Sequence, residues 1–435
     1  MTSSKRFLIA SLAALLIAGW GCDPSLTDGL IRPTTPLASP GNALPDGSRS
    51  TVSTGGVHGG FQFQAGHRDA KIPFQIVDQQ LLITARLNGR REVRLLLDTA
   101  FGMNGVLLLR PELGRELDLS YQGKVALGGG GSRDLRDADM AGGGHLELPG
   151  VTFRDLPILV MRSAPGEDLE YDGIIGDSLF DGLLEIDFDN RWIRLSTFGS
   201  TIGSEWGLGL PISFAFGIPA VEASLSLAGR DLVPVKLMLD TGADHPLYLF
   251  TQARPEFAPP RGSVQIHATG FSGPLSYRLG RTSRLTLGGY SLVQPLTGFL
   301  DPAAAGSAGP LGQDGFIGLQ GLRQFRLLID YAGQRLYLRP GRDYGSPTGF
   351  NMAGLVMSTS SGGHKTVRHV LEGSPADLAD IRTGDLIMSI DGSPVSRHTE
   401  DQLAHLFLEK GRRLQLELRR GQARLKTHLT LKPLI

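Results

Sequence analysis

A short apolar segment that ends in an aspartate occurs twice in this chain. It reads LLLDTA over residues 95–100 and LMLDTG over residues 237–242, which places Asp98 and Asp240 142 positions apart. One such segment would indicate only a buried strand followed by a turn. Two copies indicate a duplicated structural unit whose halves are related by a pseudo-twofold axis.

A second motif recurs at the same separation and supports this duplication. It reads DGIIG over residues 172–176 and DGFIG over residues 314–318. Two motifs rarely keep one register by chance. The sequence therefore predicts two homologous lobes, residues 71–200 and 205–340.

Composition indicates that these lobes are built from strands. The chain has 59 glycines and 26 prolines and few long helical periodicities, which favours many short strands joined by turns. Apolar alternation over residues 72–76 and 81–87 is followed by an Asn-Gly turn and by the apolar run 93–97. This pattern predicts a hairpin that leads into a buried strand ending at Asp98.

The charge balance limits the classes of partner. Lysine plus arginine total 43, aspartate plus glutamate also total 43, and the formal net charge is zero. A nucleic acid is therefore not expected as a partner. The 10 histidines include no His-Glu-x-x-His pattern or other close ligand spacing, so we expect no metal and no other cofactor.

The N-terminal 21 residues have the pattern of a signal peptide. Lys5 and Arg6 precede an uncharged run over residues 7–20 that is short for a membrane-spanning helix. The single cysteine, Cys22, stands where a bacterial lipoprotein carries its lipidated residue. We expect export to the cell envelope and a membrane anchor through lipid on Cys22, facing the periplasm or the exterior. Ordinary signal cleavage is the alternative, and residues 22–70, rich in Pro, Gly, Ser and Thr, predict a flexible tether.

Two aspartates that end equivalent strands can perform acid–base chemistry together. Hydrolysis of a peptide bond without a metal requires one group to take a proton from water and another to give one to the carbonyl oxygen or the leaving amine. Two close carboxyls cannot both ionise cheaply, so they share a proton and titrate at two separated pKa values. Asp98 and Asp240 are therefore the candidate catalytic pair, with a polypeptide as the expected substrate.

The residues around the two aspartates suit a pair of tight loops. A threonine can hydrogen-bond across the axis, and a small residue after it lets the backbones approach closely. The apolar triplets that end in glycine are expected to pack behind the loops. The candidate supporting residues are Thr99, Ala100, Thr241 and Gly242 in the loops and Ile174, Ile175, Gly176, Phe316, Ile317 and Gly318 in the triplets.

On these motifs, residues 71–340 resemble the pepsin and retropepsin superfamily of aspartic proteases. The segment DTGAD over residues 240–244 reproduces the retropepsin active-site pattern, whereas DTAFG over residues 98–102 departs from it at Ala100 and Phe101. The resemblance implies that the two aspartates hold the attacking water and that the threonines after them lock the loops together.

The same resemblance implies glycine-rich flap hairpins that cover the substrate. The candidates are GGGGS over residues 128–132 and TGFSG over residues 269–273. Each lies between the aspartate motif and the glycine-ended triplet of its own lobe. Plain surface loops are the alternative, because glycine clusters are common in mobile hairpins.

Residues 348–435 resemble a PDZ domain of the bacterial protease type. They carry GSPA over residues 373–376, IRTGDLI over residues 381–387 and IDG over residues 390–392. The resemblance implies that an extended peptide binds by adding to a sheet edge. The candidate receiving strand is Gly354, Leu355, Val356 and Met357, and a purely structural appendage is the alternative.

The sequence thus predicts a mostly β protein with a bilobal pepsin/retropepsin-like acid protease fold and a C-terminal PDZ-like α+β domain. Its predicted function is that of an aspartic endopeptidase whose PDZ-like domain binds a peptide or partner. One alternative is a catalytically silent peptide-binding envelope lipoprotein, favoured by Ala100 and by a Phe101 that would crowd the site. Another is a dimer in which two Asp240 loops pair and the first lobe is vestigial.

Overall fold

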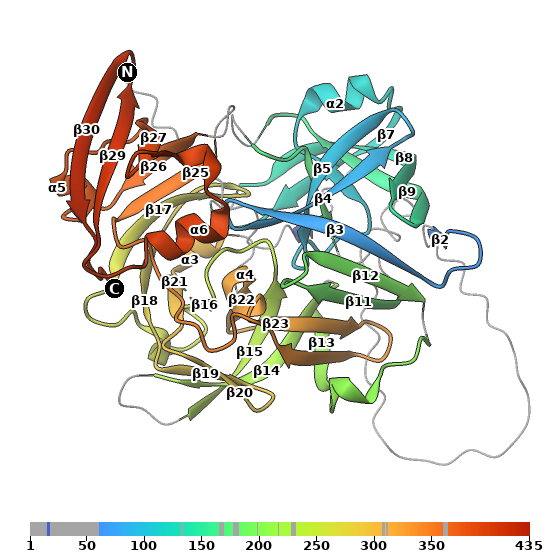
Figure 1. Ribbon diagram of the computed structural model, residues 1–435. Coiled ribbons are helices and arrows are strands. Elements are labelled where there is room, and N and C mark those ends of the chain that lie inside the picture. Colours follow the sequence, from blue (N-terminus) through green and yellow to red (C-terminus); the bar gives the residue numbers. More distant parts are fainter. Residues whose placement is uncertain are drawn as a thin grey trace, which may run out of the picture.

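The computed structural model describes residues 61–131, 134–164, 169–176, 182–197, 199–215, 217–227, 232–306, 309, 312–359 and 364–435, and the backbone of β1 (Leu15–Ile17). The described chain is mostly β, which confirms the predicted fold class. Three bodies are visible in Figure 1: the first lobe at the upper right, the second below, and the C-terminal domain in red at the upper left. Of the predicted signal segment only β1 is described, antiparallel to β7, and Cys22 lies outside the described residues.

The first lobe is a set of hairpins around an apolar core. Its elements are β2 (Phe61–Phe63), β3 (Asp69–Val77), β4 (Gln80–Leu87), β5 (Arg91–Asp98), β6 (Val106–Leu108), α2 (Pro111–Glu116), β7 (Tyr121–Gly128), β8 (Arg136–Leu148), β9 (Val151–Met161), β10 (Gly173–Gly176), β11 (Gly182–Asp187) and β12 (Trp192–Thr197). The predicted β4–β5 hairpin is present, with Leu82 opposite Leu96. Asp98 is the last residue of β5, and the parallel strand β10 places Gly176 opposite it.

The second lobe repeats this arrangement. Its elements are η2 (Ser204–Trp206), β13 (Leu210–Ala215), β14 (Ile218–Ser226), β15 (Leu232–Asp240), β16 (Leu247–Phe250), η3 (Pro255–Phe257), β17 (Val264–Gly270), β18 (Gly273–Arg281), β19 (Arg284–Leu287), β20 (Tyr290–Val293), β21 (Leu296–Leu300), α3 (Pro302–Ala305), β22 (Gly315–Gly318), α4 (Leu319–Leu322), β23 (Phe325–Asp330) and β24 (Arg335–Pro340). Asp240 ends β15, and the parallel strand β22 places Gly318 opposite it. The two lobes therefore present their aspartates from equivalent strand ends.

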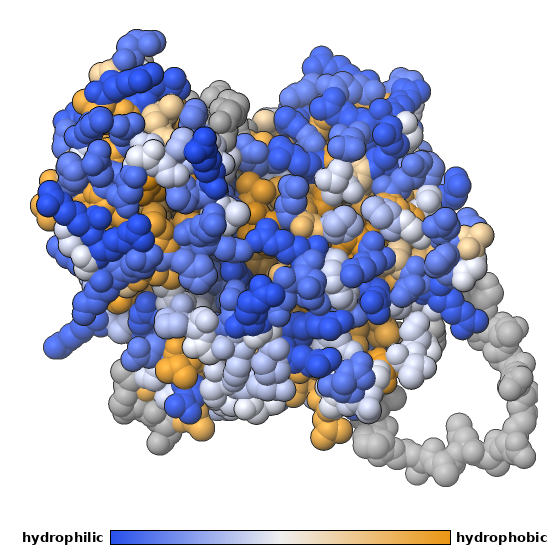
Figure 2. Space-filling model, in the orientation of Figure 1, coloured by the Kyte–Doolittle hydropathy of each residue, from blue (hydrophilic) through white to orange (hydrophobic). Residues whose placement is uncertain are grey.

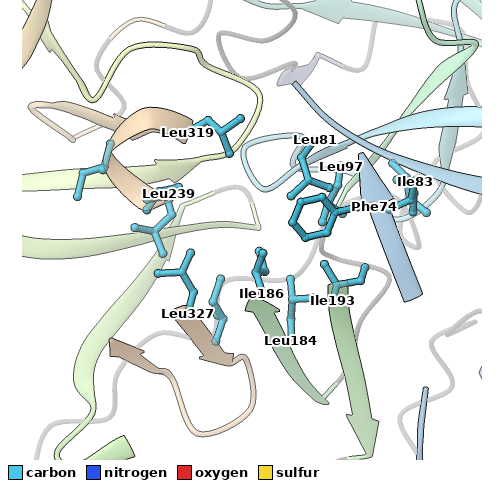
Figure 3. Close-up of a cluster of buried hydrophobic side chains, with 14 of the residues drawn as sticks. Phe74, Leu81, Ile83, Leu97, Leu184, Ile186, Ile193, Leu239, Leu319 and Leu327 are labelled. Carbon is cyan, nitrogen blue, oxygen red and sulfur yellow. The ribbon is translucent and has the colours of Figure 1, made fainter. Parts of the chain in front are cut away.

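A sheet shared by both lobes lies beneath these strand ends. Strand β11 of the first lobe pairs antiparallel with β23 of the second, and the order continues as β3-β12-β11-β23-β24-β13. Figure 3 shows its apolar face packed under the residues that precede the two aspartates; the labelled side chains include Leu184, Ile186, Ile193 and Leu327 below and Leu97 and Leu239 above. This common core fixes the two lobes relative to each other.

The C-terminal domain is a separate sheet flanked by short helices. Its elements are β25 (Leu355–Thr359), β26 (Lys365–Val370), α5 (Pro375–Leu378), β27 (Leu386–Ile390), β28 (Ser393–Pro394), η5 (Val395–Arg397), α6 (Glu400–Leu406), β29 (Arg413–Arg420) and β30 (Ala423–Thr430). Helix α6 begins with a capping box formed by Thr399 and Gln402. None of the described helices is long and apolar enough to cross a bilayer.

This domain is attached to the first lobe through a buried lysine. Asp78, in the turn between β3 and β4, accepts hydrogen bonds from the Thr359 backbone N–H at 2.9 Å and from the Lys365 ammonium at 2.9 Å. Lys365 also pairs with Glu400 and has 7% of its side chain exposed. Burial alone would lower the pKa of Lys365, but the two neighbouring carboxylates outweigh it and raise that pKa.

Helix α6 is attached to both lobes at once. Asp401, in its first turn, pairs with Arg191 of the first lobe at 2.5 Å and with Arg323 of the second at 3.3 Å. Beside it, Phe350 and Leu371 pack against the apolar cluster of the second lobe. The C-terminal domain is thus held at the boundary between the lobes.

We expect Lys365→Gln to lower the free energy of unfolding by about 3 kcal/mol, because Asp78 and Glu400 would face each other without the buried cation between them. Urea unfolding measures the change, with limited proteolysis reporting release of the C-terminal domain. Lys426→Gln is the matched control, since it removes an exposed lysine paired with Glu417 at 2.8 Å and should leave the midpoint unchanged. Identical midpoints for Lys365→Gln and the unmodified chain would contradict this account of the attachment.

Candidate active site

Asp98 and Asp240 end strands whose last four residues are all buried. The residues that lead into them, such as Leu97 and Leu239, belong to the shared core, so each strand arrives at the lobe boundary in a fixed position. The aspartates themselves are buried, with 0% of Asp98 and 1% of Asp240 exposed. A carboxylate removed from water in this way is held by hydrogen bonds rather than by solvent.

Two reciprocal pairs of hydrogen bonds join the loops across the pseudo-twofold axis. The backbone N–H of Thr99 donates to the Thr241 hydroxyl at 3.0 Å, and the backbone N–H of Thr241 donates to the Thr99 hydroxyl at 3.0 Å. Each hydroxyl in turn donates to the opposite strand, Thr99 to the Leu239 carbonyl at 2.8 Å and Thr241 to the Leu97 carbonyl at 2.7 Å. The first lobe therefore contributes its loop on equal terms with the second.

The backbone of each loop orients its carboxylate. The Ala100 N–H donates to Oδ1 of Asp98 at 2.8 Å. In the second loop, the N–H groups of Gly242 and Ala243 donate to Oδ1 of Asp240 at 2.9 and 3.0 Å. Because Oδ1 is fixed in both residues, the two carboxyl planes are set before any substrate arrives.

The glycine-ended triplets pack behind the loops, as the motif spacing predicts. A Cβ on Gly176 would overlap the Phe101 carbonyl oxygen, and a Cβ on Gly318 would overlap the His245 carbonyl oxygen. The apolar members Ile174 and Phe316 are buried beneath the site. Only glycine permits this close approach of the triplet to the loop.

Ala100 and Phe101, which depart from the retropepsin pattern, are absorbed by packing. The Ala100 methyl is fully buried in the apolar cluster of the second lobe. The Phe101 ring is fully buried in the cluster of the first lobe, together with Leu96 and Met103. Phe101 therefore packs beside the Asp98 loop as part of a buried apolar cluster.

The two predicted flap hairpins meet at their glycine tips. The Ser272 N–H donates to the Gly130 carbonyl at 2.9 Å, and a Cβ on Gly270 would overlap that same carbonyl oxygen. Phe271, at the tip of the β17–β18 hairpin, is buried in the apolar cluster that contains Phe101. Of the predicted first-lobe flap, Ser132 lies outside the described residues. The two hairpin tips are therefore joined to each other across the lobes.

A polar cluster that the motifs did not single out as functional adjoins the second loop. The Tyr248 hydroxyl donates to the Asp244 carboxylate, and His245 Nε2 lies 2.9 Å from the Tyr277 hydroxyl. Burial lowers the pKa of His245, against the opposing effect of Asp244. Burial, reinforced by Asp244, raises the pKa of both tyrosines. Burial therefore favours the uncharged forms of His245 and of both tyrosines, and DTGAD is the one sequence signal that pointed to this cluster.

A buried tyrosine, Tyr171, lies close enough to Asp98 to interact with it electrostatically. Burial raises the pKa of Tyr171 above its ordinary value, and the charge of Asp98 acts in the same direction. Tyr171 immediately precedes Asp172, which pairs with Arg110 and so anchors the triplet strand. Its equivalent in the second lobe, Asp314, pairs with Arg254 at 2.7 Å.

The candidate peptide-binding strand lies at an open edge. Strand β25 pairs with β26 alone among the described strands, and helix α6 lies along its other side. Gly354, just before β25, has φ +77°, and a Cβ there would overlap Ser374. Leu355 is buried in the domain core, whereas Val356 and Met357 are half-buried. No group of three or more His, Cys, Asp or Glu side chains arranged for a metal ion occurs in the described part of the chain.

The hydrogen bonds across the axis predict that removal of the Thr241 hydroxyl alone lowers the stability of the fold substantially. We expect Thr241→Ala to lower the free energy of unfolding by about 2–4 kcal/mol, because the Thr99 N–H and the Leu97 carbonyl would both lose their buried partner. Thr241→Ser keeps the hydroxyl and should recover most of the loss, which thermal unfolding of the three chains would measure. Equal destabilisation by alanine and serine would show that the methyl group, not the hydrogen bonds, matters.

Because Gly318 packs closely behind the Asp240 loop, we expect Gly318→Ala to lower the stability of the fold more than an alanine at an open loop position does. The added methyl would meet the His245 carbonyl, whereas at Gly309 the nearest atom is 3.4 Å from a new Cβ. We expect Gly318→Ala to destabilise by about 1–3 kcal/mol and Gly309→Ala to leave the melting temperature unchanged. A Gly318→Ala chain as stable as the unmodified one would refute the packing argument.

Comparison with known proteins identifies one of the three bodies. Residues 353–431 match the family model described as PDZ domain. No curated protein matches the chain. Among solved structures, an aspartic proteinase from Irpex lacteus is similar at 14% identity and a TM-score of 0.41, over 64% of this chain and 99% of that chain. The C-terminal body is therefore a PDZ domain, as its motifs predicted.

Proposed function

We propose that this protein is an aspartic endopeptidase in which Asp98 and Asp240 together activate a water molecule. The observation that carries the proposal is the set of reciprocal hydrogen bonds between Thr99 and Thr241. These bonds bring the two aspartate loops of one chain together with the same geometry on both sides. Buried carboxyls held in a fixed arrangement are characteristic of functional sites.

The proposed reaction uses one proton shared by the two carboxyls. The ionised carboxylate takes a proton from water as the water oxygen attacks the peptide carbonyl carbon, and the protonated carboxyl gives its proton to the carbonyl oxygen. The resulting gem-diol then breaks its C–N bond as a proton passes to the leaving amine. Burial of both groups favours the singly protonated pair, because two adjacent negative charges without water between them are costly.

Substrate entry requires the hairpin tips to separate. With Asp98 and Asp240 almost fully buried, a polypeptide cannot reach them while Gly130 accepts its bond from Ser272. The proposal requires this contact, which includes the buried Phe271 ring, to open and close during turnover, as substrate-covering hairpins do in many enzymes. The described conformation is accordingly the closed form of the proposed enzyme.

The two alternatives make different use of the same residues. In a silent peptide-binding protein, Ala100 and Phe101 would disable the first loop, but the Ala100 N–H orients Asp98 as the Gly242 N–H orients Asp240. In a dimer of second lobes, the first loop would be idle, but here it supplies half of the cross-axis bonds. Both observations favour the single-chain enzyme.

We also propose the setting in which this enzyme works. The PDZ domain binds a peptide at β25, as PDZ domains do in general, with the ligand unspecified. The signal segment and Cys22 direct export and attach the chain to a membrane of the cell envelope through an N-terminal lipid. Labelling of cells with a radioactive or clickable fatty acid, with Cys22→Ser as the control, tests the attachment.

The catalytic proposal predicts that both aspartates are required. Cleavage of a denatured protein would be followed from about pH 3 to about pH 7, the range in which a carboxyl pair changes its charge, with and without pepstatin. Asp98→Asn and Asp240→Asn should each lower the rate by at least about a thousandfold. Asp69→Asn, which changes an exposed aspartate 3.8 Å from Arg194, is the control. Loss in Asp240→Asn alone would favour the dimer, and folded chain without cleavage would favour the silent binding protein.

A further inference from the structure

A cavity of about 370 Å³ lies where the two lobes and the PDZ domain meet. The first lobe contributes Gln80 and Tyr171 to its wall, and the second contributes Gly242 and Tyr277. The PDZ domain contributes β25 and α6. In the space-filling view, apolar residues lie in a recess between the PDZ domain at the upper left and the first lobe at the upper right (Figure 2).

One end of this cavity borders the aspartate pair. Gly242, whose N–H donates to Asp240, forms part of the wall. Tyr171, which interacts electrostatically with Asp98, forms another part. The aspartates themselves do not line the cavity. The β17–β18 hairpin supplies Ala268 and Thr269, so the wall here includes one of the elements that must move to admit substrate.

The other end of the cavity is the peptide-binding side of the PDZ domain. Strand β25 turns its unpaired edge toward the cavity, with Leu355 and Met357 in the wall. Leu403 of α6, and Phe407 directly after that helix, line the same space. An unpaired strand edge beside apolar side chains fits an extended polypeptide, whose backbone pairs with the edge while its side chains fill the groove.

The contacts between the PDZ domain and the lobes hold the groove between β25 and α6 next to the space between the two lobes. Thr359, at the C-terminal end of β25, is bonded to Asp78 of the first lobe. On the approach to the other end, the Thr348 carbonyl accepts a bond from Arg281 of the second lobe at 2.9 Å. The segment 348–359, which ends with β25, is therefore held by the second lobe at Thr348 and by the first lobe at Thr359. Its residues from Thr348 to Leu355 and Met357 include several that line the cavity.

We propose that the PDZ groove and the aspartic cleft form one continuous binding channel, and that a single extended polypeptide occupies both while it is cut. This inference rests on the proposed endopeptidase function and adds the class of substrate. The preferred substrate is an unfolded chain long enough to pair with β25 and still cross the aspartate pair. A peptide bound to the PDZ domain is thus the substrate itself rather than a separate activator.

The length of the peptide substrate distinguishes one shared channel from two separate binding sites. At about 3.3 Å per residue, a peptide of about 6 residues spans roughly 20 Å and fills either the β25 edge or the cleft, whereas about 15 residues span roughly 50 Å and reach both. Two pools of random peptides with free carboxyl termini, one of each length, are the probes. We expect kcat/KM to be at least about tenfold higher for the long pool, the gain typical of a linked second contact.

A groove variant separates this effect from simple length dependence. Ala404 is half-buried on α6 and lines the cavity, so Ala404→Arg would obstruct the groove without replacing a core residue. We expect the ratio of kcat/KM for long to short peptides to fall close to one in this variant. Leu378→Arg is the control, because Leu378 is 75% exposed on α5 and away from the cavity; its ratio should stay as in the unmodified chain. An unchanged ratio in Ala404→Arg would overturn the inference.

A binding measurement answers the same question without cleavage. The full chain carrying Asp240→Asn would be mixed with the long pool bearing a benzophenone group at either end, irradiated, and analysed by mass spectrometry. Cross-links from peptides of one pool to both β25 and the β17–β18 hairpin, each lost when an excess of short peptide is added, would support a common channel. Cross-links confined to the PDZ domain would contradict it. Absence of cleavage by the unmodified chain, with cross-links at both places, would instead reject the enzyme while keeping the channel.

Discussion

The mutual hydrogen bonding of Thr99 and Thr241 is the interaction on which the rest of the site depends. Each threonine gives a backbone N–H and a hydroxyl to the opposite loop, at distances of 2.7 to 3.0 Å. Such bonds are individually worth about 1 kcal/mol, but an unpaired member of the set would be buried without water. Loss of one bond therefore leaves a buried polar group without its partner, and together the four bonds fix the loops from which both aspartates project.

The packing around the two aspartate loops holds them in this arrangement. The shared sheet beneath the site sets the separation of β5 and β15, and the glycines of the triplets let β10 and β22 close behind the loops. The hairpin tips then complete the enclosure from the other side. The PDZ domain adds a second polypeptide-binding edge at the mouth of the same space, held there by Asp78 and Asp401. The peptide-binding edge of the PDZ domain and the proposed catalytic pair therefore border the same space.

Sequence alone was sufficient where a local pattern determines the structure. The register of the duplication placed Asp98 and Asp240 at equivalent strand ends, and the Thr-small-residue pattern after them predicted contact across the axis. The PDZ motifs predicted the C-terminal domain. These features depend on residues close together in the chain or on an internal repeat that keeps a constant separation of 142 positions.

What sequence could not provide are contacts between distant segments without a repeat. Tyr277 reaches His245 from the β17–β18 hairpin, and no spacing rule connects the two. Asp78 meets Thr359 across 281 positions, in a contact that decides where the PDZ groove faces. Phe101 was expected to crowd the site, but the direction of its ring is set by the cluster of the first lobe around it. Tertiary packing, rather than local preference, determined each of these outcomes.

The most direct test of the central claim is the stoichiometry of a transition-state analogue. Isothermal titration of the purified, full chain with pepstatin, together with sedimentation to establish its mass in solution, counts functional aspartate pairs. A site built from Asp98 and Asp240 of one chain predicts one inhibitor per monomer. One inhibitor bound per two chains, in a dimer, would contradict the account and assign the site to paired second lobes.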